Sequence, residues 1–336
     1  MKIILVTDAW KPQVNGVVRT LTTTVRELEK MGHQVVVVEP SLFRSFSFPL
    51  YPEIPFVYGV KNAPHFIQPP CAVHIATEGS LGIAYNFFCR RHNIPFTTSY
   101  TTNYADYFRK YAGVPESLTY RFLRWFHCGS QWSFTATPSL DNKLTRRGIT
   151  RLRRWSRGVD TDLFHPRPKP ERKVRHLLYV GRVAVEKNID AFLELQIENT
   201  QKIVVGDGPY LKTLRNKYRD VAFHGALSGE PLAEAYASGD CFVFASKTDT
   251  FGLVVLEALA SGLPVAAFPV EGPKDIWDKD PRTGCLHEDL SVAVRNALQF
   301  GEPDACRQLA LKFRWEDCAR QFADSLVLYH KNGVLH

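Results

Sequence analysis

Residues 246–273 read SKTDTFGLVVLEALASGLPVAAFPVEGP, and their pattern indicates an α/β fold. An apolar run at 241–245 precedes it and a second, at 265–268, lies within it, so two strand-length segments flank an apolar helix-length segment. Asp249 and Glu257 stand eight positions apart around the pair Phe251-Gly252. The order predicts a strand–loop–helix–strand unit, with Asp249 at a strand's carboxyl end and Glu257 in the first turns of the helix.

This predicted loop has the chemistry of a ligand site. Open α/β sheets bind ligands in the crevice beyond the carboxyl ends of their strands. Gly252 allows close backbone approach at a helix start, where N–H groups and the positive end of the helix dipole favour a phosphate. The two carboxylates can accept hydrogen bonds from vicinal sugar hydroxyls. The arrangement suits a sugar nucleotide, and the alternative is an ordinary turn with a capping Asp and a solvated helix Glu.

Strand and helix patterns alternate along both halves of the chain. We expect strands at 3–7, 34–39, 72–76, 95–99 and 133–137, then near 176–180, 202–205, 241–244 and 264–267, with helices at 16–31 and 79–92. Three prolines in 160–175 stiffen a charged linker between the halves. The pattern predicts an α/β fold with two Rossmann-like domains facing a cleft, divided into residues 1–160 and 161–314.

The segment at 43–58, FRSFSFPLYPEIPFVY, departs from this alternation. Its six aromatic residues and three prolines disfavour a helix or a central strand and predict a long excursion from the domain. Binding of an acceptor, contact with a membrane and packing onto its own domain all stay open for it.

Composition restricts the class of protein. A hydrophobic content of 45% is typical of a globular enzyme, and no apolar run reaches the length that spans a bilayer. Seven cysteines without paired spacing indicate buried thiols in a reducing compartment, which predicts a cytoplasmic protein. Residues 1–160 carry 20 Lys and Arg against 10 Asp and Glu, and residues 161–336 carry 22 against 24. The basic half predicts an anionic partner.

Residues 246–273 resemble the donor-sugar signature of the retaining glycosyltransferases of family 4, which have the GT-B fold. Four further segments match that family: PQVNGV at 12–17, WSRGVDTDLF at 155–164, YVGRVAVEKN at 179–188 and VVGDGP at 204–209. The resemblance implies an enzyme that moves a hexose, with retention, from a UDP- or GDP-linked sugar to an acceptor. It also implies an acceptor-side first domain, a nucleotide-sugar-binding second domain, and a helix within 315–336 that packs back toward the first.

The resemblance assigns roles to individual residues. As catalytic residues it implies Arg182 and Lys187 on the diphosphate, Asp249 on the sugar and Glu257 on the ribose. The donor-binding residues that it implies are Gly16, Gly181, Gly206, Thr250, Phe251, Gly252, Leu253 and Val254, and Asn15, Tyr100 and Thr101 lie near the sugar or acceptor. No metal or cofactor besides the nucleotide-sugar co-substrate is expected, because the two cations neutralise the diphosphate. The Asp-x-Asp triplets at 160–162 and 278–280 are the alternative metal sites.

The segment TTSYTTNY at 97–104 departs from the family pattern, since most relatives have Tyr-His-Thr where this chain has Tyr-Thr-Thr. Thr101 takes the histidine's position and cannot act as a general base near neutral pH. In this family the leaving phosphate oxygen is thought to deprotonate the acceptor, so the resemblance still implies an active enzyme. A non-catalytic sugar-nucleotide-binding protein is the alternative.

Two basic segments indicate where an anionic partner binds. Residues 104–127 interleave Arg109, Lys110, Arg121 and Arg124 with aromatic residues, as an interfacial helix does, and 141–160 carries seven further cations. We therefore expect a lipid acceptor, such as diacylglycerol, on an anionic membrane surface at the inner face of the membrane. A soluble or cell-surface glycan and amphipathic core helices with solvated charges are the alternatives, and nucleic acid is not expected.

Overall fold

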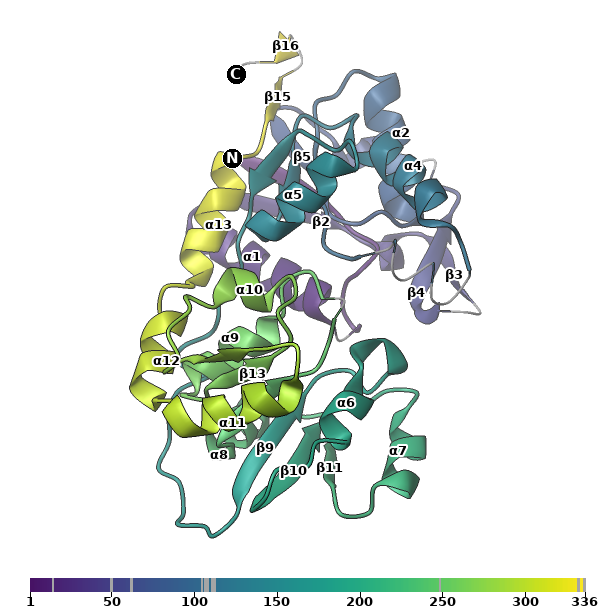
Figure 1. Cartoon of the computed structure of the whole chain (residues 1–336). Coiled ribbons are helices and arrows are strands. Elements are labelled where there is room, and N and C mark those ends of the chain that lie inside the picture. The colour runs from purple at the N-terminus through teal and green to yellow at the C-terminus, as the bar shows by residue number, and fades with distance from the viewer. Residues whose placement is uncertain are drawn as a thin grey trace. The chain divides into compact units, whose positions relative to one another are not determined.

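The computed structural model describes residues 1–13, 15–48, 51–60, 63–103, 105, 109, 113–247, 249–330 and 333–334. The chain forms two compact units (Figure 1). Unit 1 comprises Met1–Ser156 together with Trp315–His336, and unit 2 comprises Arg157–Arg314.

Unit 1 is built on a largely parallel sheet. Its strands β1 (Lys2–Val6), β2 (Gln34–Val38), β5 (Cys71–Ile75), β6 (Thr97–Ser99), β7 (Ser133–Thr135) and β8 (Leu152–Arg154) pair in the order β2-β1-β5-β6-β7-β8. The C-terminal β15 (Leu328–His330) pairs antiparallel with β5, and β16 (Gly333–Val334) pairs with β15. β5 is buried along its whole length, as a parallel strand covered on both faces should be.

Helices cover this sheet. They are α1 (Gly16–Lys30), α2 (Ser80–Arg91), α4 (Glu116–His127), α5 (Pro138–Arg146) and α13 (Trp315–Asp324), with short 3-10 turns η1 (Pro40–Leu42) and η2 (Ala63–Phe66). The Asn15 side chain caps α1 by accepting hydrogen bonds from the N–H groups of Val17 and Val18, each at 3.0 Å. α13, far along the sequence, contacts α1 and so belongs to unit 1.

Unit 2 contains a six-stranded parallel sheet. Its order is β11 (Ala222–Gly225), β10 (Thr200–Val205), β9 (Arg175–Val180), β12 (Cys241–Phe244), β13 (Val265–Ala267) and β14 (Gly284–Leu286). The helical elements are η3 (Val185–Lys187), α6 (Ile189–Leu193), α7 (Leu211–Lys217), α8 (Gly229–Ser238), α9 (Leu253–Ala260), α10 (Pro273–Ile276), α11 (Leu290–Phe300) and α12 (Pro303–Ala310). The chain runs outward from β9 to β11 and then returns to β12 on the other side, so the strand order reverses between β9 and β12.

The excursion at 43–58 is a β-hairpin outside the main sheets. β3 (Arg44–Phe48) and β4 (Tyr51–Tyr58) form a separate antiparallel pair, and β4 contacts α2. Pro55 is tolerated in β4 because, among the described residues, this strand pairs with β3 alone.

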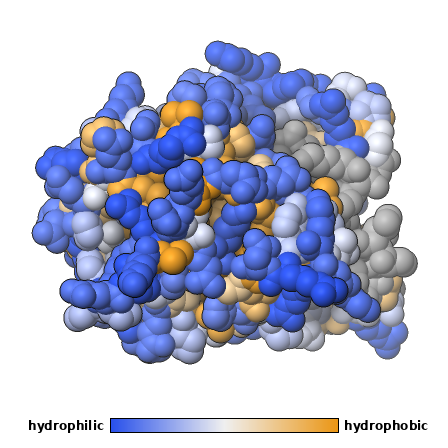
Figure 2. Space-filling view, turned by 60° about the horizontal axis from the view of Figure 1, so that its bottom comes forward, coloured by the Kyte–Doolittle hydropathy of each residue, from blue (hydrophilic) through white to orange (hydrophobic). Residues whose placement is uncertain are grey.

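The predicted α/β alternation is confirmed. The strands expected from apolar runs all form, and the helices expected at 16–31 and 79–92 begin and end within one residue of those positions. The short strands β8, β11, β14 and β15 were not expected. Within the described part of the chain, no helix is both long and apolar enough to cross a membrane. Hydrophilic residues cover most of the face in Figure 2, with apolar residues between them.

Candidate functional site

The reversal of strand order between β9 and β12 creates a topological switch point, which is where open α/β sheets bind ligands. The loop after β9 carries Gly181, Arg182 and Lys187, and the loop after β12 carries Asp249. Because both strands are parallel neighbours, these loops leave the same edge of the sheet. The residues expected on the donor therefore lie at the position where this fold class places its ligand.

An ion pair joins the two loops. Lys187 Nζ lies 2.5 Å from Asp249 Oδ1, and both side chains are partly exposed. The next residue, Asn188, has a left-handed backbone and donates from Nδ2 to the Ala245 carbonyl at 3.1 Å. The loop after β9 is thus fixed to the end of β12 by a charged and a neutral contact. Sequence reasoning expected Lys187 and Asp249 in one site, and the structure brings them into direct contact.

The turn that carries Arg182 is fixed by a buried phenol. The Tyr179 hydroxyl donates to the Arg182 carbonyl at 3.0 Å, and burial raises the pKa of this phenol, so it stays protonated and acts as a donor. The Arg182 side chain itself is exposed at the surface of unit 2. A cation on a firmly held turn is suited to contact an anion from solution.

The glycines after β9 and β10 permit a close backbone contact. Gly181 N–H donates to the Val205 carbonyl at 3.0 Å, and Gly206 N–H donates to the Gly225 carbonyl at 2.7 Å. A Cβ at Gly206 would lie 1.8 Å from the Gly181 carbonyl oxygen. The two turns can therefore approach only because position 206 has no side chain.

The start of α9 presents backbone donors. Gly252 caps the helix with a left-handed backbone, φ 86°, and the segment from Thr250 to Val254 is partly buried except for the buried Phe251. The Phe251 ring packs edge-on to Phe313 with 6.5 Å between centroids. The first N–H groups of a helix lack intrahelical partners, so this helix start can bind a phosphate or a sugar oxygen.

Glu257 lies further inside unit 2 than the sequence indicates. It is 3% exposed on α9, and its Oε2 accepts a hydrogen bond from the Tyr236 hydroxyl of α8 at 2.9 Å. Tyr236 orients this carboxylate, yet no sequence pattern links the two residues, because their contact depends on how α8 packs on α9. A carboxylate has further acceptor capacity beyond one such bond.

The remaining predicted residues lie in unit 1. Asn15 and Gly16 are exposed at the start of α1, and Tyr100 and Thr101 follow β6. Tyr100 is buried, and its hydroxyl donates to Asn103 Oδ1 at 3.3 Å. Thr101 is partly buried. Within this unit the residues follow the carboxyl ends of two parallel strands, β1 and β6.

Two buried acids at the same edge were missed by sequence reasoning. Asp8, after β1, accepts hydrogen bonds from Leu81 N–H at 2.8 Å and Gly82 N–H at 3.1 Å at the start of α2. Glu78, after β5, lies 3.2 Å from Nε2 of the buried His127. Burial raises the pKa of both carboxyl groups. Their contacts fix the loops to helices α2 and α4. In the sequence, the one feature that could have indicated these two acids was a polar residue soon after an apolar strand.

The Asp-x-Asp triplets form local turns. Asp160 Oδ1 accepts from Leu163 N–H at 3.1 Å, and Asp278 Oδ1 accepts from Asp280 N–H at 3.2 Å. Asp280 also pairs with Arg282 at 2.7 Å, and this guanidinium lowers the pKa of the Asp280 carboxyl. These carboxylates support their own turns.

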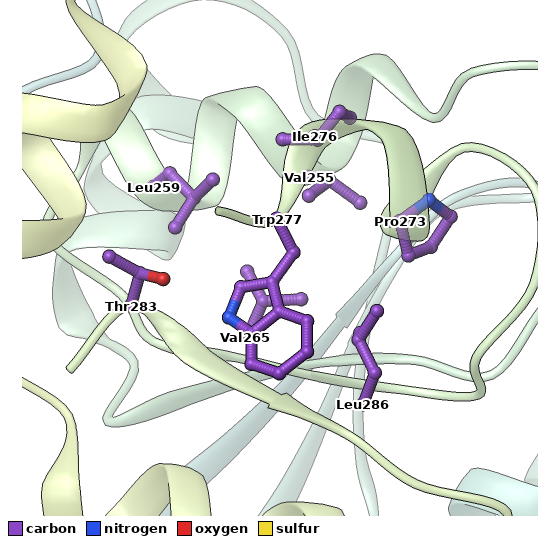
Figure 3. A pocket seen from close by; sticks show the side chains of 8 residues that line it. All are labelled: Val255, Leu259, Val265, Pro273, Ile276, Trp277, Thr283 and Leu286. Carbon is purple, nitrogen blue, oxygen red and sulfur yellow. The ribbon is translucent and has the colours of Figure 1, made fainter. Parts of the chain in front are cut away.

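A pocket beneath α9 is apolar and small (Figure 3). Its lining residues include Val255, Val265, Leu286 and Trp277, whose indole lies near the centre of the view. Its volume of about 10 Å³ is that of a packing defect with room for at most one water molecule. This pocket is therefore too small to hold a sugar nucleotide.

Two family models match this chain. One, described as Glycosyltransferase Family 4, matches residues 14–163, and the other, described as Glycosyl transferases group 1, matches residues 174–300. The solved structure of sucrose-phosphate synthase from Thermosynechococcus elongatus is similar in fold, with a TM-score of 0.77 and 20% identity over 96% of this chain and 97% of that one.

Curated relatives extend the match over most of the chain. A GDP-mannose-dependent alpha-mannosyltransferase of Mycobacterium tuberculosis is 30% identical over 85% of this chain and 83% of its own length. The alpha-monoglucosyldiacylglycerol synthase of Streptococcus pneumoniae is 30% identical over 100% of this chain and 86% of its own length. The chain therefore belongs to glycosyltransferase family 4 and is a hexosyltransferase of the GT-B fold that uses a nucleotide sugar.

Proposed function

We propose that this enzyme transfers a hexose from a UDP- or GDP-linked donor to a lipid acceptor at a membrane surface, with retention of anomeric configuration. The observation that carries the proposal is the contact between Lys187 and Asp249 at the switch point, beside Arg182 and the start of α9. This arrangement offers cations for a diphosphate and acceptors for sugar hydroxyls in one place.

Lys187 and Arg182 bind the donor diphosphate in this proposal. The Lys187–Asp249 pair is partly exposed, so an incoming diphosphate can compete for the ammonium group. Asp249 then accepts hydrogen bonds from the sugar, and the start of α9 supplies backbone donors. As the glycosidic bond breaks, negative charge grows on the leaving phosphate, and the two cations stabilise it in the transition state.

The acceptor hydroxyl loses its proton to the leaving phosphate oxygen on the same face of the sugar. The hydroxyl of Thr101, which follows β6, contributes no base near neutral pH. Attack from the face that the leaving group vacates retains the anomeric configuration. No metal is needed in this mechanism, because Arg182 and Lys187 supply the positive charge. Glu257 binds the ribose of the nucleotide.

A lipid acceptor is supported by α4 and by the curated relatives. On its inner side α4 buries Tyr120, Leu123 and Phe126 against the rest of unit 1. Its outer side exposes Leu118, Arg121, Arg124 and Trp125. This exposed side, with two cations and two apolar residues, suits anionic headgroups and the apolar boundary beneath them. The pneumococcal relative is named for the synthesis of a glucosyldiacylglycerol. Our proposal is that the enzyme acts at the inner face of the membrane.

The structure also corrects the expectation for residues 104–127. Tyr120 and Phe126 are core residues of unit 1, so they cannot contact lipid while the unit is folded. Arg109 pairs with Glu116 at 3.0 Å, which reduces the charge that it offers to headgroups. Lys110 lies outside the described residues. Of the four cations named in residues 104–127, Arg121 and Arg124 are thus the two that are exposed on α4.

The test is a transfer assay with matched acceptors. The purified chain is given UDP-glucose or GDP-mannose with either diacylglycerol in anionic vesicles or a soluble oligosaccharide. We expect product on the lipid with at least one donor, and an α-linkage by NMR from these α-linked donors. A β-linked product would overturn retention, and product on the oligosaccharide alone would overturn the lipid acceptor.

A further inference from the structure

The two faces of the β3–β4 hairpin differ sharply. In its register Phe46 lies opposite Phe56 and Arg44 opposite Tyr58, while Ser45 lies opposite Val57. Side chains alternate along a strand, so Arg44, Phe46, Phe56 and Tyr58 share one face. We call these four residues the outer face of the hairpin. The opposite face carries Val57, which is 3% exposed.

The inner side of the hairpin is fixed to unit 1. Val57 belongs to the hydrophobic core that also contains Leu81 and Tyr85 of α2. Its backbone N–H donates to Ser80 Oγ at 2.8 Å, at the first residue of α2. This attachment makes the orientation of the hairpin a property of the folded unit, and the outer face must point away from that core.

The outer face exposes three aromatic side chains. Phe46 is 50% exposed, Phe56 45% and Tyr58 48%. The ring centroids of Phe46 and Phe56 are 5.2 Å apart, and those of Phe46 and Tyr58 are 6.1 Å apart. The rings contact one another and still present about half of their surface to solvent. Scattered apolar residues are normal at a surface, but three adjacent aromatic rings on one strand pair form a patch.

We propose that the outer face of this hairpin inserts into the headgroup boundary of an anionic lipid bilayer. The rings supply apolar surface, the Tyr58 hydroxyl can stay hydrated, and Arg44 in the same row can bind a lipid phosphate. Arg44 is the single charged residue among the outer-face side chains that the structure describes. This inference rests on the lipid-surface part of the proposed function and names a contact element for it.

Charge and size favour a membrane over a second copy of the chain. Residues 1–160 carry a net charge of +10, which attracts an anionic surface and makes two copies of this half repel each other. Half-exposed aromatic rings offer roughly 100 Å² each, or about 300 Å² together. A stable protein interface buries about 800 Å² on each partner. The three described rings are therefore too small a surface for a stable dimer by themselves but large enough for shallow insertion.

The hairpin is linked through α2 to the cationic helix α4. β4 contacts α2, and Asn86 of α2 donates from Nδ2 to the Phe126 carbonyl of α4 at 2.9 Å. Arg90 of α2 lies over the Trp125 ring of α4, 5.2 Å from its centroid. Hairpin and α4 are thus held by one helix, so electrostatic attraction at α4 and insertion at the hairpin can act on the same bilayer.

The experiment replaces Phe46, Phe56 and Tyr58 by serine together and measures sedimentation with vesicles of phosphatidylglycerol and phosphatidylcholine. Phe300→Ser is the matched control, since Phe300 is 48% exposed on α11 of unit 2. We expect about a tenfold or greater loss of binding at high salt for the triple variant, because insertion is the salt-resistant part. The control should bind as the wild type does.

A second measurement covers the case in which the triple variant fails to fold. Phe46→Trp and Phe300→Trp are compared in vesicles of brominated lipid, and we expect extra quenching for Phe46→Trp only. Wild-type binding with equal quenching in both variants would overturn the hairpin contact and leave the lipid acceptor standing. If the wild type bound no vesicle, the proposal that the enzyme acts at a membrane surface would be wrong. Hydrolysis of the donor in solution would still measure its enzymatic activity.

Discussion

At the scale of single residues, the ion pair of Lys187 with Asp249 is the main structural argument for donor binding. The ammonium group of Lys187 is held by Asp249 at 2.5 Å in a partly exposed position, so it is oriented before a donor arrives. We expect Lys187→Ala and Arg182→Ala each to lower the transfer rate about 10²–10³-fold, because each removes one charge from the departing diphosphate. Steady-state kinetics with saturating acceptor measures this loss.

Lys212→Ala is the control for these variants, since Lys212 is an exposed lysine on α7 in the same unit. It should keep wild-type turnover and donor affinity. If Lys187→Ala matched Lys212→Ala in both respects, the assignment of the diphosphate to this loop would be wrong.

His74 provides a pH-dependent term in stability. It is fully buried in β5, hydrogen-bonded to Thr97 Oγ1 at 2.8 Å and Ser99 Oγ at 3.0 Å, and burial lowers its pKa to about 3. Below its ordinary pKa of 6.5 the unfolded chain binds a proton that the folded chain does not. The contribution of this residue to stability is therefore complete above pH 6.5 and decreases as the pH falls toward 3.

We expect His74→Gln to flatten the loss of stability on acidification. Each pH unit between the two pKa values costs the wild type about 1.4 kcal/mol through this residue. Urea unfolding at several pH values measures the slope, and the exposed His92 provides the control variant His92→Gln. Equal slopes in wild type and His74→Gln would show that another group carries the pH dependence.

At the scale of secondary-structure elements, the turns after β9 and β10 depend on glycine. Gly206→Ala places a Cβ 1.8 Å from the Gly181 carbonyl, whereas Gly225→Ala meets no atom within 4 Å at a backbone φ of 74°. Gly225→Ala should cost about 1 kcal/mol through backbone strain alone. Gly206→Ala should cost a further 1–3 kcal/mol, roughly, from overpacking.

Urea unfolding of the two glycine variants tests this difference. Gly206→Ala should also weaken donor binding, because its turn packs directly on the turn that carries Arg182. Equal stability of the two variants would mean that the turns can separate without cost, and the close backbone contact would then have no energetic role.

The elements that could be predicted from the sequence are those with a strong local pattern. Apolar runs gave the central strands, and parallel order placed Lys187 and Asp249 at one edge of the sheet. Short edge strands such as β11, with two apolar residues in AFHG, carry too little pattern to detect. The Tyr236–Glu257 contact depends on packing between two helices, which periodicity does not specify. The hairpin was hidden by its prolines, which mark an edge strand only once a partner strand is known.

At the scale of the whole molecule, the diphosphate can be neutralised either by basic side chains or by a bound metal ion. The proposed mechanism uses Arg182 and Lys187, while Asp160, Asp278 and Asp280 accept hydrogen bonds within their own turns. We therefore expect transfer to persist in EDTA. Loss of activity that Mn²⁺ or Mg²⁺ alone restores would contradict this and would direct attention to Asp160 and Asp162.

The uneven charge of the chain predicts that lipid binding and donor chemistry can be separated. Residues 1–160 carry a net charge of +10 and residues 161–336 a net charge of −2, while Arg182, Lys187 and Asp249 all belong to unit 2. Charge reversal at Arg121 and Arg124 on α4 should weaken binding to anionic vesicles at low salt by about tenfold or more, since each basic residue contributes about 1 kcal/mol near such a surface.

The same variant should hydrolyse the donor in solution at the wild-type rate, because α4 belongs to unit 1 and the proposed diphosphate ligands to unit 2. High salt should weaken wild-type binding until it approaches that of the variant, because the Debye length shortens to a few ångströms. Liposome sedimentation and a donor-hydrolysis assay on one preparation measure both quantities. Unchanged binding at low salt would rule out α4 as the electrostatic contact, and a parallel loss of donor hydrolysis would show that the two activities share one site.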